Sequence, residues 1–131
     1  MVENDYIMRL THEMVRTWLK LLFGIDEEKE EEIIFENKDS GDLYRRLMLM
    51  SEDGAVNEAE NLLCECLDAQ EEKRELENLK VALYFYDYLN GKSNEYLENC
   101  GFSRQEIREG ICRVMRQYGY GELADTWGDE W

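Results

Sequence analysis

Two cysteines, Cys64 and Cys66, are separated by a single residue in the stretch "EDGAVNEAENLLCECLDAQ". Paired thiolates bind a metal or exchange electrons when both sulfur atoms can reach the same partner. The surrounding residues predict a helix, in which successive side chains turn by about 100°, so these two thiols point about 200° apart. One ion cannot bind both unless the helix unwinds. We therefore expect Cys66 in the core and Cys64 at its edge.

Other residues that could support chemistry are scarce. His12 is the only histidine, and Cys100 and Cys112 do not form a second close cysteine pair. The sequence has no glycine-rich phosphate loop, no nucleophile elbow and no Glu-x-x-His spacing typical of metal sites. We therefore interpret His12 as a surface residue, expect no metal and no cofactor, and predict that the protein is not an enzyme.

The charge of the chain restricts its partners. With 31 acidic and 15 basic residues, the formal charge is −16. Residues 1–23 hold three acids and three bases, residues 24–42 nine acids and two bases, and residues 119–131 four acids and no base. Only residues 91–118 have an excess of bases, five against four acids. A molecule with this charge repels DNA and anionic membranes, so we expect neither as a partner.

Two stretches bear on the compartment. The amino-terminal "MVENDYIMRL" has acids where a secretory signal peptide has bases. The longest apolar run, "LKVALYFYDYL" at residues 79–89, is too short to span a membrane and contains Lys80 and Asp87. We therefore predict a cytoplasmic protein, in which the four cysteines are reduced.

The spacing of apolar residues predicts helices along most of the chain. The 131 residues contain 44% hydrophobic residues and no proline, which fits one domain with its own core and few helix breaks. We expect a single all-α domain of six to seven helices in antiparallel hairpins. We treat residues 119–131 as an acidic tail that need not be ordered. The predicted helices span about 4–23, 26–35, 43–50, 55–70, 73–90, 93–99 and 103–118.

The predicted helix at 73–90 is apolar on nearly all sides, so it should lie at the centre of the domain. Its tyrosines, Tyr84, Tyr86 and Tyr88, need hydrogen-bond partners for their hydroxyl groups. Some of these side chains should therefore reach the surface or line a groove. We predict that they contact an unidentified protein partner, together with Trp127 from the acidic tail.

The first predicted helix carries a broad apolar stripe, and a domain of this size has limited core with which to cover it. We therefore predict a homodimer to which the helix at 4–23 contributes. The stripe consists of Ile7, Leu10, Met14, Val15, Trp18, Leu21 and Leu22.

Residues 53–68, "DGAVNEAENLLCECLD", resemble the second helix of a tetratricopeptide repeat, with a glycine turn, the small Ala59 at a close-packing position, and then Leu63 and Leu67. Residues 43–50 would form the first helix of that pair. With the opening "NDYIMRL" and the acidic second segment, the sequence also resembles a family of short, uncharacterised bacterial helical proteins. This resemblance implies an all-helical fold, tetratricopeptide-like in the middle, and no activity.

A second motif, "YLENCGFSRQEIREGI" at residues 96–111, resembles a helix-turn-helix with Gly101 in its turn. The resemblance implies contacts with DNA by arginines on its second helix, namely Arg104, Arg108, Arg113 and Arg116. Two functions therefore remain open. We predict a non-enzymatic protein-interaction or adaptor module, which the charge favours, and the alternative is a DNA-binding regulator that uses residues 93–118.

Overall fold

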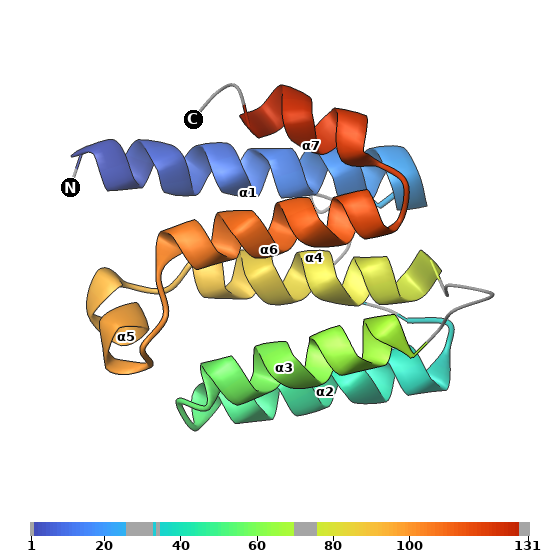
Figure 1. The fold of residues 1–131 in the computed structure, drawn as a ribbon, viewed down its shortest axis with the longest axis horizontal. Helices are drawn as coiled ribbons and strands as arrows, with labels where there is room; N and C mark the ends of the chain where they lie inside the picture. Colours follow the sequence, from blue (N-terminus) through green and yellow to red (C-terminus); the bar gives the residue numbers. More distant parts are fainter. Residues whose placement is uncertain (1, 26–32, 34, 70–75, 129–131) are drawn as a thin grey trace.

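The computed structural model describes residues 2–25, 33, 35–69 and 76–128. Within these ranges the chain forms seven α-helices and no strand, so the predicted all-α single domain is confirmed (Figure 1). The helices are α1 (Val2–Phe23), α2 (Lys38–Glu52), α3 (Val56–Asp68), α4 (Leu76–Asn90), α5 (Asn94–Asn99), α6 (Arg104–Gln117) and α7 (Gly121–Gly128).

Six of these helices, α1 to α6, coincide with predicted ones, but the seventh does not. The predicted acidic helix at 26–35 falls mostly outside the described residues. Residues 121–128 form α7, although we treated residues 119–131 as a tail without a helix. Trp127 explains this difference, because its side chain is fully buried in the core and holds α7 against the rest of the domain.

Side-chain caps fix the start of several helices. The Asn37 side chain accepts a hydrogen bond from the backbone N–H of Asp39 at the start of α2. The predicted capping box of α6 is present: Ser103 accepts from the N–H of Glu106, and the Glu106 carboxylate accepts from the N–H of Ser103. Such caps satisfy backbone donors that the helix itself leaves unpaired.

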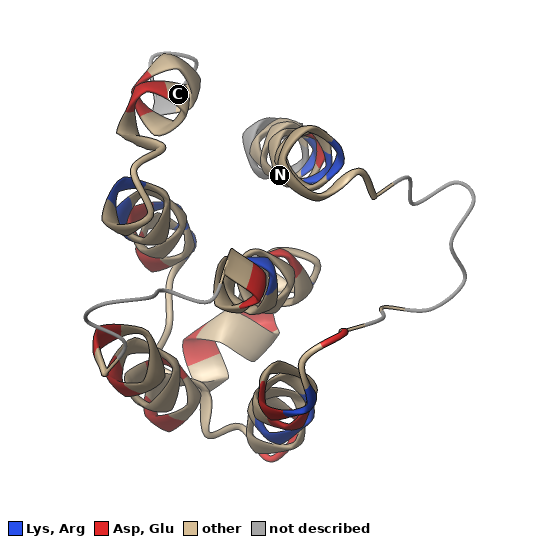
Figure 2. Cartoon of the chain, turned by 90° about the vertical axis from the view of Figure 1, so that its right-hand side faces the viewer, with Lys and Arg blue, Asp and Glu red and all other residues tan. Residues whose placement is uncertain are grey.

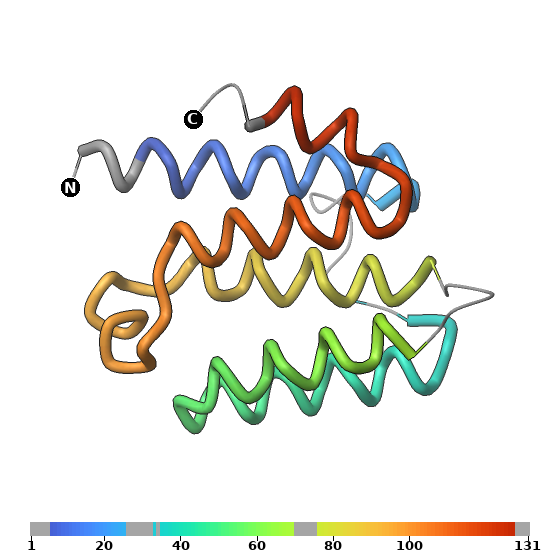
Figure 3. Tube along the Cα trace, viewed as in Figure 1, coloured from blue at the N-terminus to red at the C-terminus, as the bar shows by residue number. Residues whose placement is uncertain are grey.

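The helix α4 lies at the centre, as predicted. Viewed along the helices, it is surrounded by α1, α2, α3 and α6 (Figure 2), and it packs directly on α1, α2 and α6. Ten of its 15 residues are buried. Two further large contacts join helices that follow one another in the chain: α2 and α3 form an antiparallel hairpin, and α7 folds back along α6 (Figure 3).

Polar groups link α4 to its neighbours inside the core. The Asn90 amide donates a hydrogen bond of 2.9 Å to the backbone oxygen of Met8 on α1. On the α2 side, the Ser40 hydroxyl donates to the Asn78 side chain at 2.7 Å. The Thr11 hydroxyl on α1 differs from these groups, because it is fully buried and has no hydrogen-bond partner among the described residues.

Candidate interaction surfaces

The structure buries three of the four side chains that we predicted to contact a partner. Tyr84 is only 7% exposed, and Tyr86 and Trp127 are fully buried. Tyr88 is half-buried and lies under the ammonium group of Lys92, which is 4.5 Å from the ring centroid. A groove lined by all three tyrosines does not form, because Tyr86 points about 200° away from Tyr84 and Tyr88, which share the other side of the helix.

Tyr84 faces the α2 side of α4, where it belongs to an aromatic cluster. Its ring centroid lies 6.4 Å from that of Phe35 and 6.2 Å from that of Tyr44. Burial raises the pKa of the Tyr44 hydroxyl, with smaller contributions from Tyr88 and Asp87. These rings pack against each other and contribute to the stability of the α2–α4 contact.

Tyr86 faces the opposite side and joins three helices through hydrogen bonds. Its hydroxyl donates to Glu60 Oε2 on α3 at 2.8 Å and accepts from Arg113 Nη2 on α6 at 3.1 Å. Arg113 also donates to Cys64 Sγ at 3.2 Å and lies 3.7 Å from Glu60. Burial and the Glu60 carboxylate raise the pKa of Tyr86, so this phenol stays protonated throughout the physiological range.

The ring of Tyr86 reaches this cluster by crossing α6 at Gly110. A Cβ atom at Gly110 would lie 2.3 Å from Cζ of Tyr86 and 2.5 Å from its hydroxyl oxygen. Any larger residue at this position would therefore collide with the ring. Sequence reasoning did not identify this contact, and the only signal for it was a glycine in the middle of an otherwise regular helix.

The cysteines lie close to the positions predicted for them, with one difference. Cys64 is half-buried as expected, but Cys66 is also half-buried, because Leu63 and Leu67 occupy the core positions of α3. Burial raises the pKa of both thiols, so neither is an activated nucleophile at neutral pH. In the part of the chain that the structure describes, no three His, Cys, Asp or Glu side chains are arranged to hold a metal ion.

The arginines of the helix-turn-helix-like segment make contacts within the domain. Arg104 donates to the Asn94 side chain and to the backbone oxygens of Asn90 and Lys92, which closes the turn between α4 and α6. Arg116 pairs with Asp125 of α7 at 2.8 Å. The two others, Arg108 and Arg113, also interact with neighbouring groups.

The apolar stripe of α1 divides into two parts. Trp18 is 2% exposed and Val15 is fully buried, so this part belongs to the core. Tyr6 is 55% exposed, Leu21 is 65% exposed, and Leu10 is half-buried. At about 100° per residue these three side chains fall within about 60° of each other, so they share one side of the helix. We call Tyr6, Leu10 and Leu21 the apolar flank of α1.

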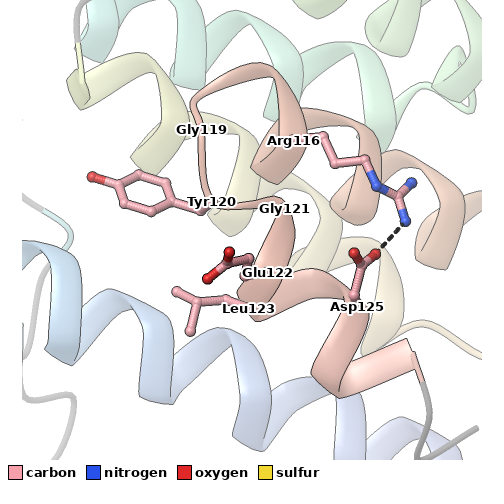
Figure 4. Close-up of a pocket in the computed structure, with 7 residues that line it drawn as sticks. All are labelled: Arg116, Gly119, Tyr120, Gly121, Glu122, Leu123 and Asp125. Carbon is pink, nitrogen blue, oxygen red and sulfur yellow. Dashed lines mark hydrogen bonds and ion pairs between the residues drawn. The ribbon is translucent and has the colours of Figure 1, made fainter.

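Two of the shallow hollows formed by described residues lie near the ends of α4 and α6. One lies between α1 and the end of α4, where His12 Nδ1 is 3.0 Å from the Asp87 carboxylate; it is lined by Met8, Arg9, His12, Glu13, Arg16, Asp87, Asn90 and Gly91. The other lies beside the α6–α7 turn and is lined by Arg116, Gly119, Tyr120, Gly121, Glu122, Leu123 and Asp125 (Figure 4). Both mix charges of opposite sign, which gives neither a clear preference for a small charged ligand.

The geometry thus defines an all-α domain with a central buried helix and an apolar flank on its first helix. None of the described helices is long and apolar enough to cross a membrane. Residues 1–119 match the model of a family of unknown function, DUF6483, and the chain belongs to that family. No curated protein and no solved structure matches the chain.

Proposed function

We propose that the protein is a protein-interaction module that associates through the apolar flank of α1, with a second copy of itself as the first partner. The observation that carries the proposal is the exposure of Leu21 and Tyr6, two large apolar side chains on one side of the same helix. Exposed apolar surface of this kind favours association because contact removes it from water.

The charge distribution supports a second copy as the partner. Two molecules of charge −16 repel each other, and in a twofold contact each charge meets its own copy. Residues 1–23 contain three acids and three bases, so a contact through α1 brings the least like charge together. Figure 1 shows that the first half of α1 extends past the end of α7, so α7 does not cover it.

We also make proposals about the location of the protein in the cell and about the two sequence resemblances. We propose a cytoplasmic location, which the four free cysteines support. The α2–α3 hairpin is proposed to be a single tetratricopeptide-like pair, as in the bacterial family that the sequence resembles.

DNA binding through residues 93–118 is the alternative proposal. It has less support because Arg104 and Arg116 contact groups within the domain.

Two leucines of nearly equal exposure allow a matched test. Leu21 on α1 is 65% exposed and Leu49 on α2 is 63% exposed. We expect light scattering after size exclusion to give the mass of a dimer for the unmodified protein. Leu21→Glu should weaken the dimer at least about tenfold, because it places a carboxylate in an apolar contact, whereas Leu49→Glu adds the same charge and should leave the mass unchanged.

Three results would contradict the proposal. The first is a monomeric unmodified protein at high micromolar concentration. The second is an equal effect of the two substitutions, which would show that added charge alone is responsible. The third is a Leu21→Glu protein that has lost its helical circular dichroism, because the side chain would then belong to the core. A gel shift with mixed DNA fragments at physiological salt tests the alternative, and we expect no retardation.

A further inference from the structure

The carboxyl-terminal helix α7 lies outside the family match and follows a junction with two glycines. The match to the family model ends at residue 119, immediately before α7 begins. Two glycines, Gly119 and Gly121, flank this junction, and Gly119 has a φ of +88°, a conformation that glycine adopts without strain. Figure 3 shows the chain reversing its direction here, so that α7 returns along α6.

The backbone hydrogen bonds that close the end of α6 do not involve α7. The N–H of Gly119 donates to the oxygen of Arg116 at 3.0 Å, and the N–H of Tyr120 donates to the oxygen of Met115 at 2.8 Å. These bonds satisfy the carbonyl groups that a helix end leaves unpaired. Release of α7 would therefore leave the backbone of α6 intact.

One narrow side of α7 makes its contact with the domain. Ala124 and Trp127 are buried on that side, whereas Glu122, Asp125 and Thr126 are exposed on the other. The rings of Trp127 and Trp18 on α1 pack in a T-shaped arrangement, with centroids 5.4 Å apart and planes at 87°. This pattern is that of an amphipathic helix that lays one aromatic anchor into a groove.

The remaining interactions of α7 are weak. Arg116 and Asp125 form an ion pair at 2.8 Å, but both side chains are more than half exposed, and such pairs contribute little. An isolated helix of eight residues is not stable in water, so α7 depends on its contact with the domain for its structure. Trp127 is the largest side chain in this contact, with Ala124 buried beside it and Leu123 half-buried against the core.

We propose that the surface of α1 and α6 that α7 covers at Trp18, which we call the groove, is a docking site for α7 of a second copy of this chain, and that the chain's own α7 covers it in the free protein. The contacts of α7 support this occupant. An α7 from another copy carries the same Trp127 to pack on Trp18 and the same Asp125 to pair with Arg116, so it can make every contact that the chain's own α7 makes.

This docking site adjoins the apolar flank of α1 but uses a different side chain. Trp18 is 2% exposed and contacts α7, whereas Leu21 is 65% exposed. Exchange of α7 can therefore be tested in chains that carry Leu21→Glu, so that failure of one proposal is distinguishable from failure of the other. Exchange through a glycine-containing hinge is a common route to association between identical chains.

The first test follows hydrogen exchange in the unmodified protein. If α7 opens on its own, the amides of Ala124 to Trp127 should exchange at least about tenfold faster than those of Ile111 to Met115, because local opening costs less than global unfolding. Equal protection of the two segments would overturn the proposal, since α7 would then never leave its groove separately.

The second test uses a fluorescent peptide of residues 119–131 as the α7 of a separate molecule. It should bind the Leu21→Glu, Trp127→Ala chain at least about tenfold more tightly than the Leu21→Glu chain, because the first chain fills its own groove poorly. A control peptide with Trp127→Ala should not bind either chain. Equal binding to both chains, or absence of binding to both, would overturn the proposal. So would a Trp127→Ala chain without cooperative unfolding, since α7 would then be an integral part of the core.

Discussion

The central helix α4 and the first helix α1 are both rich in apolar residues, but the rest of the domain buries a larger part of α4. Ten of the 15 residues of α4 are buried, and its apolar side chains meet neighbours in every direction. On α1, Trp18 and Leu19 are buried while Tyr6 and Leu21 remain exposed. The difference lies in the extent of packing: α4 has large contacts with α1, α2 and α6, whereas α1 has its large contact with α4 and touches α7 through Trp18.

This comparison shows that apolar content alone does not locate a binding surface. A helix with apolar residues on all sides is surrounded by others and presents little to a partner. A helix whose apolar stripe is wider than its neighbours can cover leaves part of that stripe in water, and this part is available for association. The tyrosines of α4 were therefore weaker candidates than the leucines of α1.

A pair of leucine substitutions tests the comparison most directly. Leu83 on α4 is fully buried and Leu21 on α1 is 65% exposed. Leu83→Ala should reduce the free energy of unfolding by about 2–5 kcal/mol, because it removes buried surface and leaves a cavity. Leu21→Ala should change it by no more than about 0.5 kcal/mol. Urea unfolding followed by circular dichroism, at concentrations below dimerisation, measures both, and similar losses would contradict the difference between the helices.

The contact between α4 and α6 should be nearly as sensitive. Gly110→Ala places a methyl group within the ring of Tyr86, so the helices must separate, and we expect a loss of about 3 kcal/mol. Gly41→Ala in α2 is the matched control, since its nearest neighbour would be 3.5 Å away. That substitution should stabilise the domain by up to about 1 kcal/mol, because alanine favours a helix over glycine. Equal effects would mean that Tyr86 does not cross α6 at this point.

The hydroxyl of Tyr86 gives a smaller effect with a distinct pH dependence. Tyr86→Phe removes the donor to Glu60, and we expect a loss of about 1–2 kcal/mol at neutral pH. Burial raises the pKa of Tyr86 in the folded state above its unfolded value near 10, so the folded protein binds the proton more tightly. The stabilisation from the Tyr86 proton is therefore fully present below pH 10 and is lost above it, by about 1.4 kcal/mol per pH unit for this buried tyrosine and by less for more exposed ones.

Tyr96 contributes to the same decline, because burial raises its pKa to about 12. Its hydroxyl donates to the backbone oxygen of Ser51, and this bond also requires the proton. Comparing urea midpoints at pH 8 and pH 11 for the unmodified protein and Tyr86→Phe separates the two tyrosines. An unchanged pH dependence in Tyr86→Phe would show that Tyr86 does not control the alkaline loss.

The smallest predicted effect is a gain, and it concerns the buried side of α1. Thr11 is fully buried, and its hydroxyl has no hydrogen-bond partner among the described residues. Thr11→Val replaces this hydroxyl by a methyl group of similar size and removes an uncompensated desolvation cost. We expect a gain of about 1 kcal/mol, measured by urea unfolding. A loss of stability would indicate that the hydroxyl has a partner.

The sequence predicted most of the fold because the relevant signals are local. The Ser103–Glu106 capping box and the apolar residues of α4 act over one or a few helical turns, so they are visible in the sequence. The helix α7 was missed because Trp127 stabilises it through Trp18, which lies far away in the chain. The eight residues of α7 contain no pattern that identifies Trp18 as the neighbour of Trp127.

The candidate surfaces were predicted less well for a related reason. The exposure of a side chain depends on which neighbouring helices cover it. The spacing of apolar residues along one helix does not contain this information. Trp18 and Leu21 have similar places in the apolar stripe, yet only Trp18 is covered. The burial of Tyr86 depends in the same way on Gly110, which belongs to another helix.

The contact between Trp18 and Trp127 also has a consequence for the order of events during synthesis. The two tryptophans are separated by 109 residues in the chain. At roughly 5–20 residues per second, the ribosome needs about 5–20 s to make the second after the first. Throughout this interval Trp18 lacks its aromatic neighbour, so the growing chain has more uncovered apolar surface on α1 than the finished domain does.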